Sequence, residues 1–164
     1  MNFSKKSLGQ NFLSDQNIIK KIINLTDIRN KNIIEIGPGK GALTNEILSK
    51  KPKSLILIEK DFFLAGELQK KFSKNKSIKI YNEDILKFNF NKIGKSSYKI
   101  FGNLPYNISS QILVKIVKLD RLSIKLNDMV FMFQKELGEK IISKFPSKKY
   151  SRLSIFTNLK FKVL

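Results

Sequence analysis

The sequence predicts an α/β fold built on a doubly wound, mostly parallel sheet. Its short apolar segments are nearly continuous and rich in Ile, and they alternate with segments of helical spacing. This is the pattern of strands that crossover helices bury on both faces. With 164 residues and 41% hydrophobic composition the chain can bury one sizeable core. A single domain is therefore expected.

Apolar spacing and turn residues place each element along the chain. Ser14 or Asp15 can cap a first helix that carries regularly spaced isoleucines: Ile18, Ile19, Ile22 and Ile23. We expect strands over residues 33–36, 55–58, 78–81, 99–101, 129–133 and 153–161. We expect helices over residues 42–50, 63–72, 110–117 and 136–143.

The charge balance favours a polyanionic partner. The chain has 32 Lys+Arg against 13 Asp+Glu, a formal net charge of +19, and neutralising phosphates releases counterions. Because the lysines are scattered, a codon composition rich in A and T also explains part of the excess.

The chain has no Cys and no His, which excludes disulfides, a structural zinc site and a Ser-His-Asp triad. No apolar run reaches the ~20 residues of a membrane helix, so we expect a cytoplasmic protein that does not bind a membrane. We also expect no metal site.

Polar and glycine signals follow four of the predicted strands. The turn Gly37-Pro38-Gly39-Lys40-Gly41 comes after the first strand, Glu59 ends the second, Asp84 follows the third, and Asn103 follows the fourth. Ligands of parallel α/β sheets bind outside the carboxyl ends of the strands. The sequence therefore predicts a binding site at this edge.

Taken singly, these signals are ambiguous. The glycine turn differs from the G-x-G-x-x-G of dinucleotide enzymes and is also compatible with a turn that binds nothing. Glu59 lies 22 residues after Gly37, where an acid can accept hydrogen bonds from both ribose hydroxyls of a nicotinamide or another nucleoside cofactor. It is also compatible with a solvated charge. Asp84 can accept from an adenine amino group, or can cap a turn.

The segment Asn103-Leu104-Pro105-Tyr106 is the most informative. An exocyclic aromatic amine is a poor nucleophile, because its lone pair is delocalised into the ring. Two acceptors, the Asn103 side-chain oxygen and the Leu104 carbonyl, can hold its hydrogens and turn the lone pair toward an electrophilic methyl group. Pro105 fixes the loop, and Tyr106 can stack on an extruded base. The alternative is an ordinary turn with a packed tyrosine.

Three longer motifs resemble one family. Leu8-Gly9-Gln10-Asn11-Phe12-Leu13, the segment from Glu35 to Thr44 and the segment from Gly102 to Ser109 are similar to those of the S-adenosylmethionine-dependent rRNA adenine N6,N6-dimethyltransferases. The segments Phe133-Gln134-Lys135-Glu136 and Tyr150-Ser151-Arg152-Leu153-Ser154 also resemble later motifs of that family. The resemblance runs from about residue 5 to residue 161.

The resemblance implies a Rossmann-like class I methyltransferase fold and S-adenosyl-L-methionine as cofactor. The product is N6,N6-dimethyladenosine at two adjacent adenosines in the hairpin near the 3′ end of small-subunit (16S) rRNA, a step of ribosome biogenesis. The partner is that rRNA or an immature 30S particle, and we expect a monomer. The cofactor-binding residues implied are Asn11, Leu13, Gly37, Glu59, Asp84 and Asn103. The catalytic, target-base residues implied are Asn103, Leu104, Pro105 and Tyr106. Lys5 and Lys6 would touch rRNA phosphate.

Two departures from the family qualify this reading. Ser151 stands where the family usually has Gly, and the chain stops before the family's last strand and C-terminal helical domain. We thus expect a basic arm over residues 1–13, a catalytic domain over residues 14–164, a sheet without its last strand, and an unpaired apolar edge over residues 153–164. A truncated reading frame leaves a non-catalytic small-subunit assembly factor or an inactive fragment as alternatives. A nicotinamide-dependent reductase is disfavoured.

Overall fold

A five-stranded parallel sheet forms the centre of the molecule. The structure, a computed structural model, describes residues 13–119 and 124–163. The strand order is β3-β2-β1-β4-β5, and every neighbouring pair is parallel. The strands are β1 (Asn32–Ile36), β2 (Ser54–Glu59), β3 (Ile78–Asn82), β4 (Ser97–Asn103) and β5 (Lys125–Met132). The strand order reverses between β1 and β4, which creates a crevice at their carboxyl ends.

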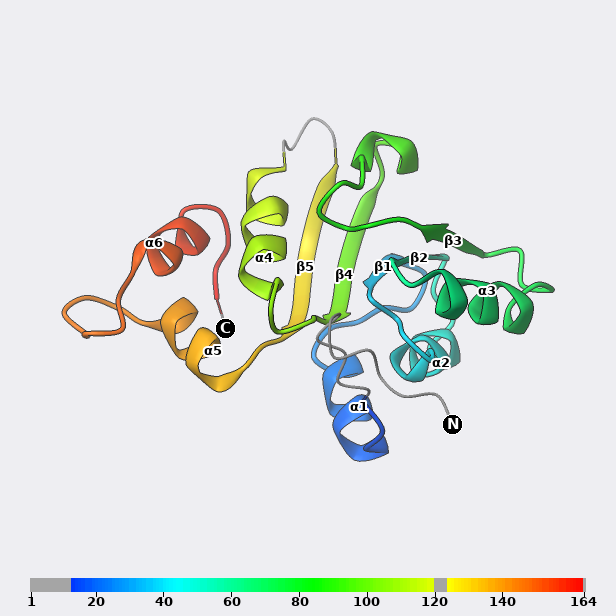
Figure 1. The fold of residues 1–164 in the computed structure, drawn as a ribbon, viewed down its shortest axis with the longest axis horizontal. Helices are drawn as coiled ribbons and strands as arrows, with labels where there is room; N and C mark the ends of the chain where they lie inside the picture. Colours follow the sequence, from blue (N-terminus) through cyan, green and yellow to red (C-terminus); the bar gives the residue numbers. More distant parts are fainter. Residues whose placement is uncertain (1–12, 120–123, 164) are drawn as a thin grey trace.

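Helices cover both faces of the sheet, as the sequence predicts for a doubly wound fold (Figure 1). The helices α1 (Gln16–Ile23), α2 (Ala42–Ser49) and α3 (Phe62–Lys71) pack with one apolar cluster. The helix α4 (Ser109–Lys118) and the short 3₁₀ helix η2 (Phe90–Ile93) pack with the other. Further along, α5 (Lys135–Ile142) and α6 (Arg152–Asn158) lie beside α4.

Side-chain alternation along β1 assigns its residues to the two layers. Ile34 and Ile36 belong to the cluster under α4, and Ile33 belongs to the cluster under α1, α2 and α3. Because successive side chains of a strand point to opposite faces, Glu35 faces the same layer as Ile33. It therefore lies against α2, where Thr44 donates to it.

The strand predicted over residues 153–161 is wrong, since this segment forms α6. Ser151 begins the helix with a reciprocal capping box to Ser154, which satisfies backbone donors that a helix start leaves free. The predicted apolar edge is wrong for the same reason. Leu153, Phe156 and Phe161 pack against an apolar cluster that α4 and α5 supply, formed by Leu113, Val117 and Ile141. A short apolar run does not by itself distinguish a strand from a buried helix.

The remaining predicted elements are confirmed, with shifted ends. Asp15 caps α1 by accepting from the N–H groups of Asn17 and Ile18. β4 extends beyond the predicted residues 99–101, and β5 begins four residues before the predicted start at residue 129. The predicted arm lies outside the described residues except for Leu13.

Candidate active site

One cavity lies at the carboxyl edge of the sheet. Its volume is ≈ 350 Å³. The turn after β1, the end of β2, the segment after β3 and the loop after β4 all contribute to its wall. The residues predicted for the site that line it are Leu13, Gly37, Glu59, Asp84, Asn103 and Pro105. The topology thus brings the four separate sequence signals together in one place.

The glycine turn approaches the catalytic segment closely. Gly37 has φ +64°, a left-handed conformation that side-chain-bearing residues rarely adopt. Its N–H donates to the Ile58 carbonyl at 2.9 Å, which fixes the turn to the end of β2. An added Cβ on Gly37 would lie 3.9 Å from the carbonyl oxygen of Asn103. The glycine turn and the segment that begins at Asn103 are therefore neighbours across the β1–β4 crevice.

Glu59 is a buried carboxylate held by backbone donors. Its side chain is 5% exposed. Its Oε1 accepts from the Asp61 N–H at 2.9 Å and its Oε2 accepts from the Gly39 N–H at 3.0 Å. Burial raises the pKa of Glu59, and these two N–H donations oppose that rise. Since a carboxylate has about four lone-pair sites, Glu59 retains acceptors for ligand hydroxyl groups while its backbone contacts hold it in position.

Glu35 is a site residue that the sequence analysis quoted in a motif but gave no role. It lines the cavity and is 1% exposed. Burial raises its pKa to about 8, although the Thr44 hydroxyl donates to its Oε2 at 2.7 Å and lowers it. At neutral pH this carboxyl group is therefore protonated. An acid inside an otherwise apolar strand was the only sequence signal for it.

Asp84 makes the turn contact that the sequence left open, and it also lines the cavity. Its Oδ1 accepts from the Leu86 N–H at 2.9 Å, which is a turn contact, and its Oδ2 pairs with Lys60 Nζ at 2.8 Å. Burial raises the pKa of Asp84, but the hydrogen bonds from Lys60 and Leu86 outweigh it and lower the pKa. Asp84 also lines the cavity, so an ionised acceptor is presented there.

The loop after β4 is held in a compact turn. The Ile108 N–H donates to the Pro105 carbonyl at 3.2 Å, and the Ser109 hydroxyl donates to the Tyr106 carbonyl at 3.1 Å. Just before the loop, a Cβ on Gly102 would meet Leu104 Cδ2 at 2.7 Å and the Ile36 carbonyl at 3.2 Å. Only glycine fits between β1 and this loop without displacement, so the position of Asn103 depends on it.

Two of the predicted residues that the structure describes, Leu104 and Tyr106, do not line the cavity. The Leu104 side chain is buried in the core under α4, at 1% exposure. Tyr106 is 37% exposed and lies outside the cavity wall, in the loop that Asn103 begins. Asn11 lies outside the described residues, as do Lys5 and Lys6.

Within the described part of the chain, no helix is long and apolar enough to cross a membrane. The same residues contain no group of three or more Asp and Glu side chains arranged to hold a metal ion.

Solved structures with this fold are methyltransferases. A dimethyladenosine transferase from Plasmodium falciparum superposes with a TM-score of 0.79 at 30% identity, over 91% of this chain and 52% of that chain. The 23S rRNA methyltransferase ErmE superposes with a TM-score of 0.73 at 26% identity, over 90% of this chain and 57% of that chain. The chain thus has the Rossmann-like fold of these methyltransferases, with a cavity at the switch point of its sheet.

Sequence comparison narrows this class to one family. The family model for ribosomal RNA adenine dimethylase matches residues 1–163. Ribosomal RNA small subunit methyltransferase A of Pelagibacter ubique is 49% identical over 160 residues, and its counterpart in Francisella tularensis subsp. novicida is 46% identical over 162. These alignments cover 98% and 96% of this chain but 60% of each relative. The chain belongs to the ribosomal RNA adenine dimethylase family, and it spans about 60% of the length of these relatives.

Proposed function

We propose that this chain transfers methyl groups from S-adenosyl-L-methionine to the exocyclic N6 of two adjacent adenosines in the 3′-terminal hairpin of small-subunit rRNA. The product is N6,N6-dimethyladenosine, made during small-subunit biogenesis in the cytoplasm. The observation that carries the proposal is that the glycine turn at Gly37 and the segment that begins at Asn103 line one cavity. Residues 14–164 are the catalytic domain in this proposal.

The cavity residues fit the cofactor. Gly37, without a side chain and with its left-handed φ, leaves room for the methionine part beside the backbone. Glu59 offers oxygens to the ribose hydroxyls, and Asp84 offers an acceptor to the adenine amino group. Leu13 contributes an apolar surface at the mouth. When bound, S-adenosylmethionine supplies an electrophilic methyl group on a sulfonium.

Asn103 and Leu104 prepare the target amine. The Asn103 side-chain oxygen and the Leu104 carbonyl accept the two hydrogens of N6, which turns the nitrogen lone pair out of the purine plane. Pro105 fixes the backbone of this loop, and its carbonyl accepts from Ile108. The partly exposed Tyr106 ring stacks on the adenine that has left its helix. These residues supply orientation rather than proton transfer.

A strong base is not needed for this chemistry. The amine becomes acidic only after it gains a methyl group, so its proton can then pass to water. A chain with no histidine can therefore perform it.

The experiment is methyl transfer from labelled S-adenosylmethionine to small-subunit rRNA or immature 30S particles, followed by nucleoside mass spectrometry. We expect dimethyladenosine at two adjacent positions in the 3′-terminal hairpin. Retention of the RNA in a gel-shift assay without methyl incorporation would contradict the enzymatic function. It would favour a non-catalytic assembly factor that binds small-subunit RNA.

A further inference from the structure

A groove runs along α4, away from the mouth of the cavity. Its volume is ≈ 610 Å³. Both of its walls continue walls of the cavity. Ile85 lines the cavity and Leu86 lines the groove, while Ile108 lines the cavity and Ser110 lines the groove. The end of the groove at Leu86 and Ser110 therefore lies next to the cavity.

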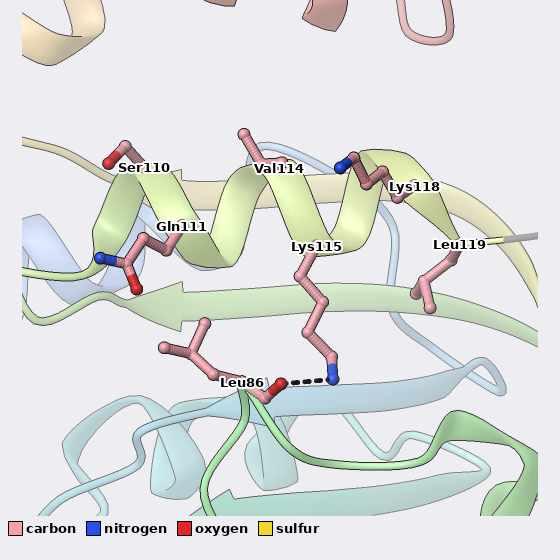
Figure 2. A pocket seen from close by; sticks show the side chains of 7 residues that line it. All are labelled: Leu86, Ser110, Gln111, Val114, Lys115, Lys118 and Leu119. Atoms are coloured by element: carbon pink, nitrogen blue, oxygen red, sulfur yellow. Dashed lines mark hydrogen bonds between the residues drawn. The ribbon is translucent and has the colours of Figure 1, made fainter.

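Two rows of side chains on α4 form one wall (Figure 2). Gln111, Lys115 and Leu119 recur at every fourth position, and Figure 2 shows them pointing toward the segment at Leu86. Ser110, Val114 and Lys118 form the neighbouring row on the outer side of the helix. Each row thus offers one polar, one apolar and one cationic side chain.

The side chains that line the groove in the described part of the chain carry positive charge and no negative charge. Lys115 Nζ donates to the carbonyls of Leu86 at 2.9 Å and Phe88 at 2.8 Å, and both acceptors are uncharged. Burial lowers the pKa of Lys115, while Asp84 acts from a distance to raise it. Lys118 is exposed. The residues that line the groove include two lysines and no acid.

We propose that this groove binds the phosphodiester backbone of the RNA strand next to the target adenosine. The inference rests on the proposed function, since it names where the rest of that substrate lies. Lys118 and the remaining N–H of Lys115 contact phosphate oxygens, and the amide of Gln111 donates to phosphate or ribose. The apolar side chains of Leu86 and Leu119 cover the sugar face. Ser110 to Lys118 span about 12 Å of helix, room for about three phosphates of a stacked strand.

Salt dependence tests the cationic part. Each phosphate contact adds about 0.7 to the slope of log affinity against log salt for single-stranded RNA. Lys118→Gln should lower that slope by about this amount, measured with a fragment of small-subunit rRNA that includes the 3′-terminal hairpin. Lys74→Gln is the control, because Lys74 is exposed in the turn between α3 and β3, on another side of the molecule. S-adenosylmethionine affinity should stay at its wild-type value in both variants.

Thiol protection tests the location. The chain has no cysteine, so Gln111→Cys carries a single thiol in the groove. RNA at about ten times its Kd should slow alkylation of that thiol about tenfold. Gln69→Cys is the matched control on the exposed side of α3, and its rate should not change.

The outcomes separate the two proposals. If the wild-type chain methylates the RNA but both variants behave like their controls, the groove proposal is overturned and the proposed function stands. That outcome also fits a protein partner in the groove. If the wild-type chain neither binds nor methylates the RNA, both proposals fall together.

Discussion

Similar polar residues are arranged differently at two edges of the sheet, the amino edge formed by the starts of the strands and the carboxyl edge formed by their ends. Near the amino edge, Lys99 Nζ pairs with Asp128 Oδ2 at 2.6 Å, and the Thr26 hydroxyl donates to the same Asp128 oxygen at 2.6 Å. Charge there is matched by opposite charge. At the carboxyl edge, Glu59 is held by backbone N–H groups and faces a cavity. These two hydrogen-bond partners are backbone N–H groups rather than a cation, which leaves acceptor positions for a ligand.

The comparison teaches that burial alone does not mark a functional residue. Lys99 and Glu59 are both buried, and both are charged. Their bonding partners distinguish them. Lys99 pairs with an oppositely charged side chain, whereas the backbone donors to Glu59 leave acceptors for a ligand. The following substitutions separate the two edges. At the carboxyl edge, Asn103→Ala should change methyl transfer and Glu59→Gln should change cofactor binding, whereas Asp128→Ala near the amino edge should change only stability.

Asn103→Ala should have the largest effect. It removes one of the two acceptors that orient the target amine, and loss of such positioning costs about 100-fold in rate. Methyl transfer to small-subunit rRNA measures it, and RNA affinity should be nearly unchanged. Asn45→Ala, at an exposed position of α2, is the control. A wild-type methylation rate for Asn103→Ala would refute the role given to this side chain.

Glu59→Gln should weaken S-adenosylmethionine binding by about 10- to 100-fold. Hydrogen bonds to a charged group contribute about 1.5–3 kcal/mol, and each 1.4 kcal/mol is tenfold in affinity. Isothermal titration calorimetry measures the change. Glu67 is an exposed acid on α3, the helix that follows β2, and Glu67→Gln should bind the cofactor like the wild type. Equal affinities for the two variants would show that the Glu59 carboxylate is structural, like the cluster at the opposite edge.

Asp128→Ala should destabilise the fold by about 1–3 kcal/mol and leave cofactor affinity unchanged. Lys99 then loses its carboxylate partner, a cost reduced by the 43% exposure of the Asp128 side chain. Hydrogen bonds from Lys99 and Thr26 lower the pKa of Asp128 below 3.8. Its contribution is therefore present above pH 3.8 and is lost as the pH falls through the lowered pKa.

Urea unfolding of Asp128→Ala beside Asn127→Ala, an exposed neighbour on β5, provides the measurement. A drop in cofactor affinity for Asp128→Ala without loss of stability would erase the distinction between the two edges.

Glu35→Gln should change how stability depends on pH. The folded-state pKa of about 8 lies above the ordinary 4.5, so the folded chain binds more protons than the unfolded chain between these values. Wild-type stability falls as the pH rises through that window, by up to about 1.4 kcal/mol per pH unit from this group. Gln stays neutral, so the variant should gain stability relative to the wild type from pH 5 to pH 8. Thermal unfolding at several pH values measures this, and a constant difference would contradict a protonated Glu35.

Sequence reasoning predicted that several polar residues meet at the carboxyl edge, but not their geometry. Gly37, Glu59, Asp84 and Asn103 could be assigned because parallel strands put their carboxyl ends on one edge, and the structure places all four on one cavity. Their distances could not be predicted, since a Cβ on Gly102 would meet the Ile36 carbonyl of β1 at 3.2 Å, a close approach that the sequence does not specify. The role of each residue toward a ligand stays a prediction.

The C-terminal segment and Glu35 show where the sequence was insufficient. The apolar side chains of residues 153–161 fit a strand or a helix, and the capping contact between Ser151 and Ser154 favours the helix. Glu35 reads as part of a buried strand, and only the fold places Thr44 against it and opens the cavity beside it. The helix combines this local cap with packing on α4 and α5, whereas the environment of Glu35 depends on tertiary contacts alone.

Titration of S-adenosylmethionine into the folded wild-type chain tests the central claim most directly. A cavity in which backbone N–H groups hold Glu59 in position for a ligand should bind the cofactor with saturable, one-to-one heat. The melting temperature should be higher in the presence of the cofactor. A chain that unfolds cooperatively, yet shows neither binding heat nor any shift of its melting temperature, would contradict a cofactor site at the carboxyl edge.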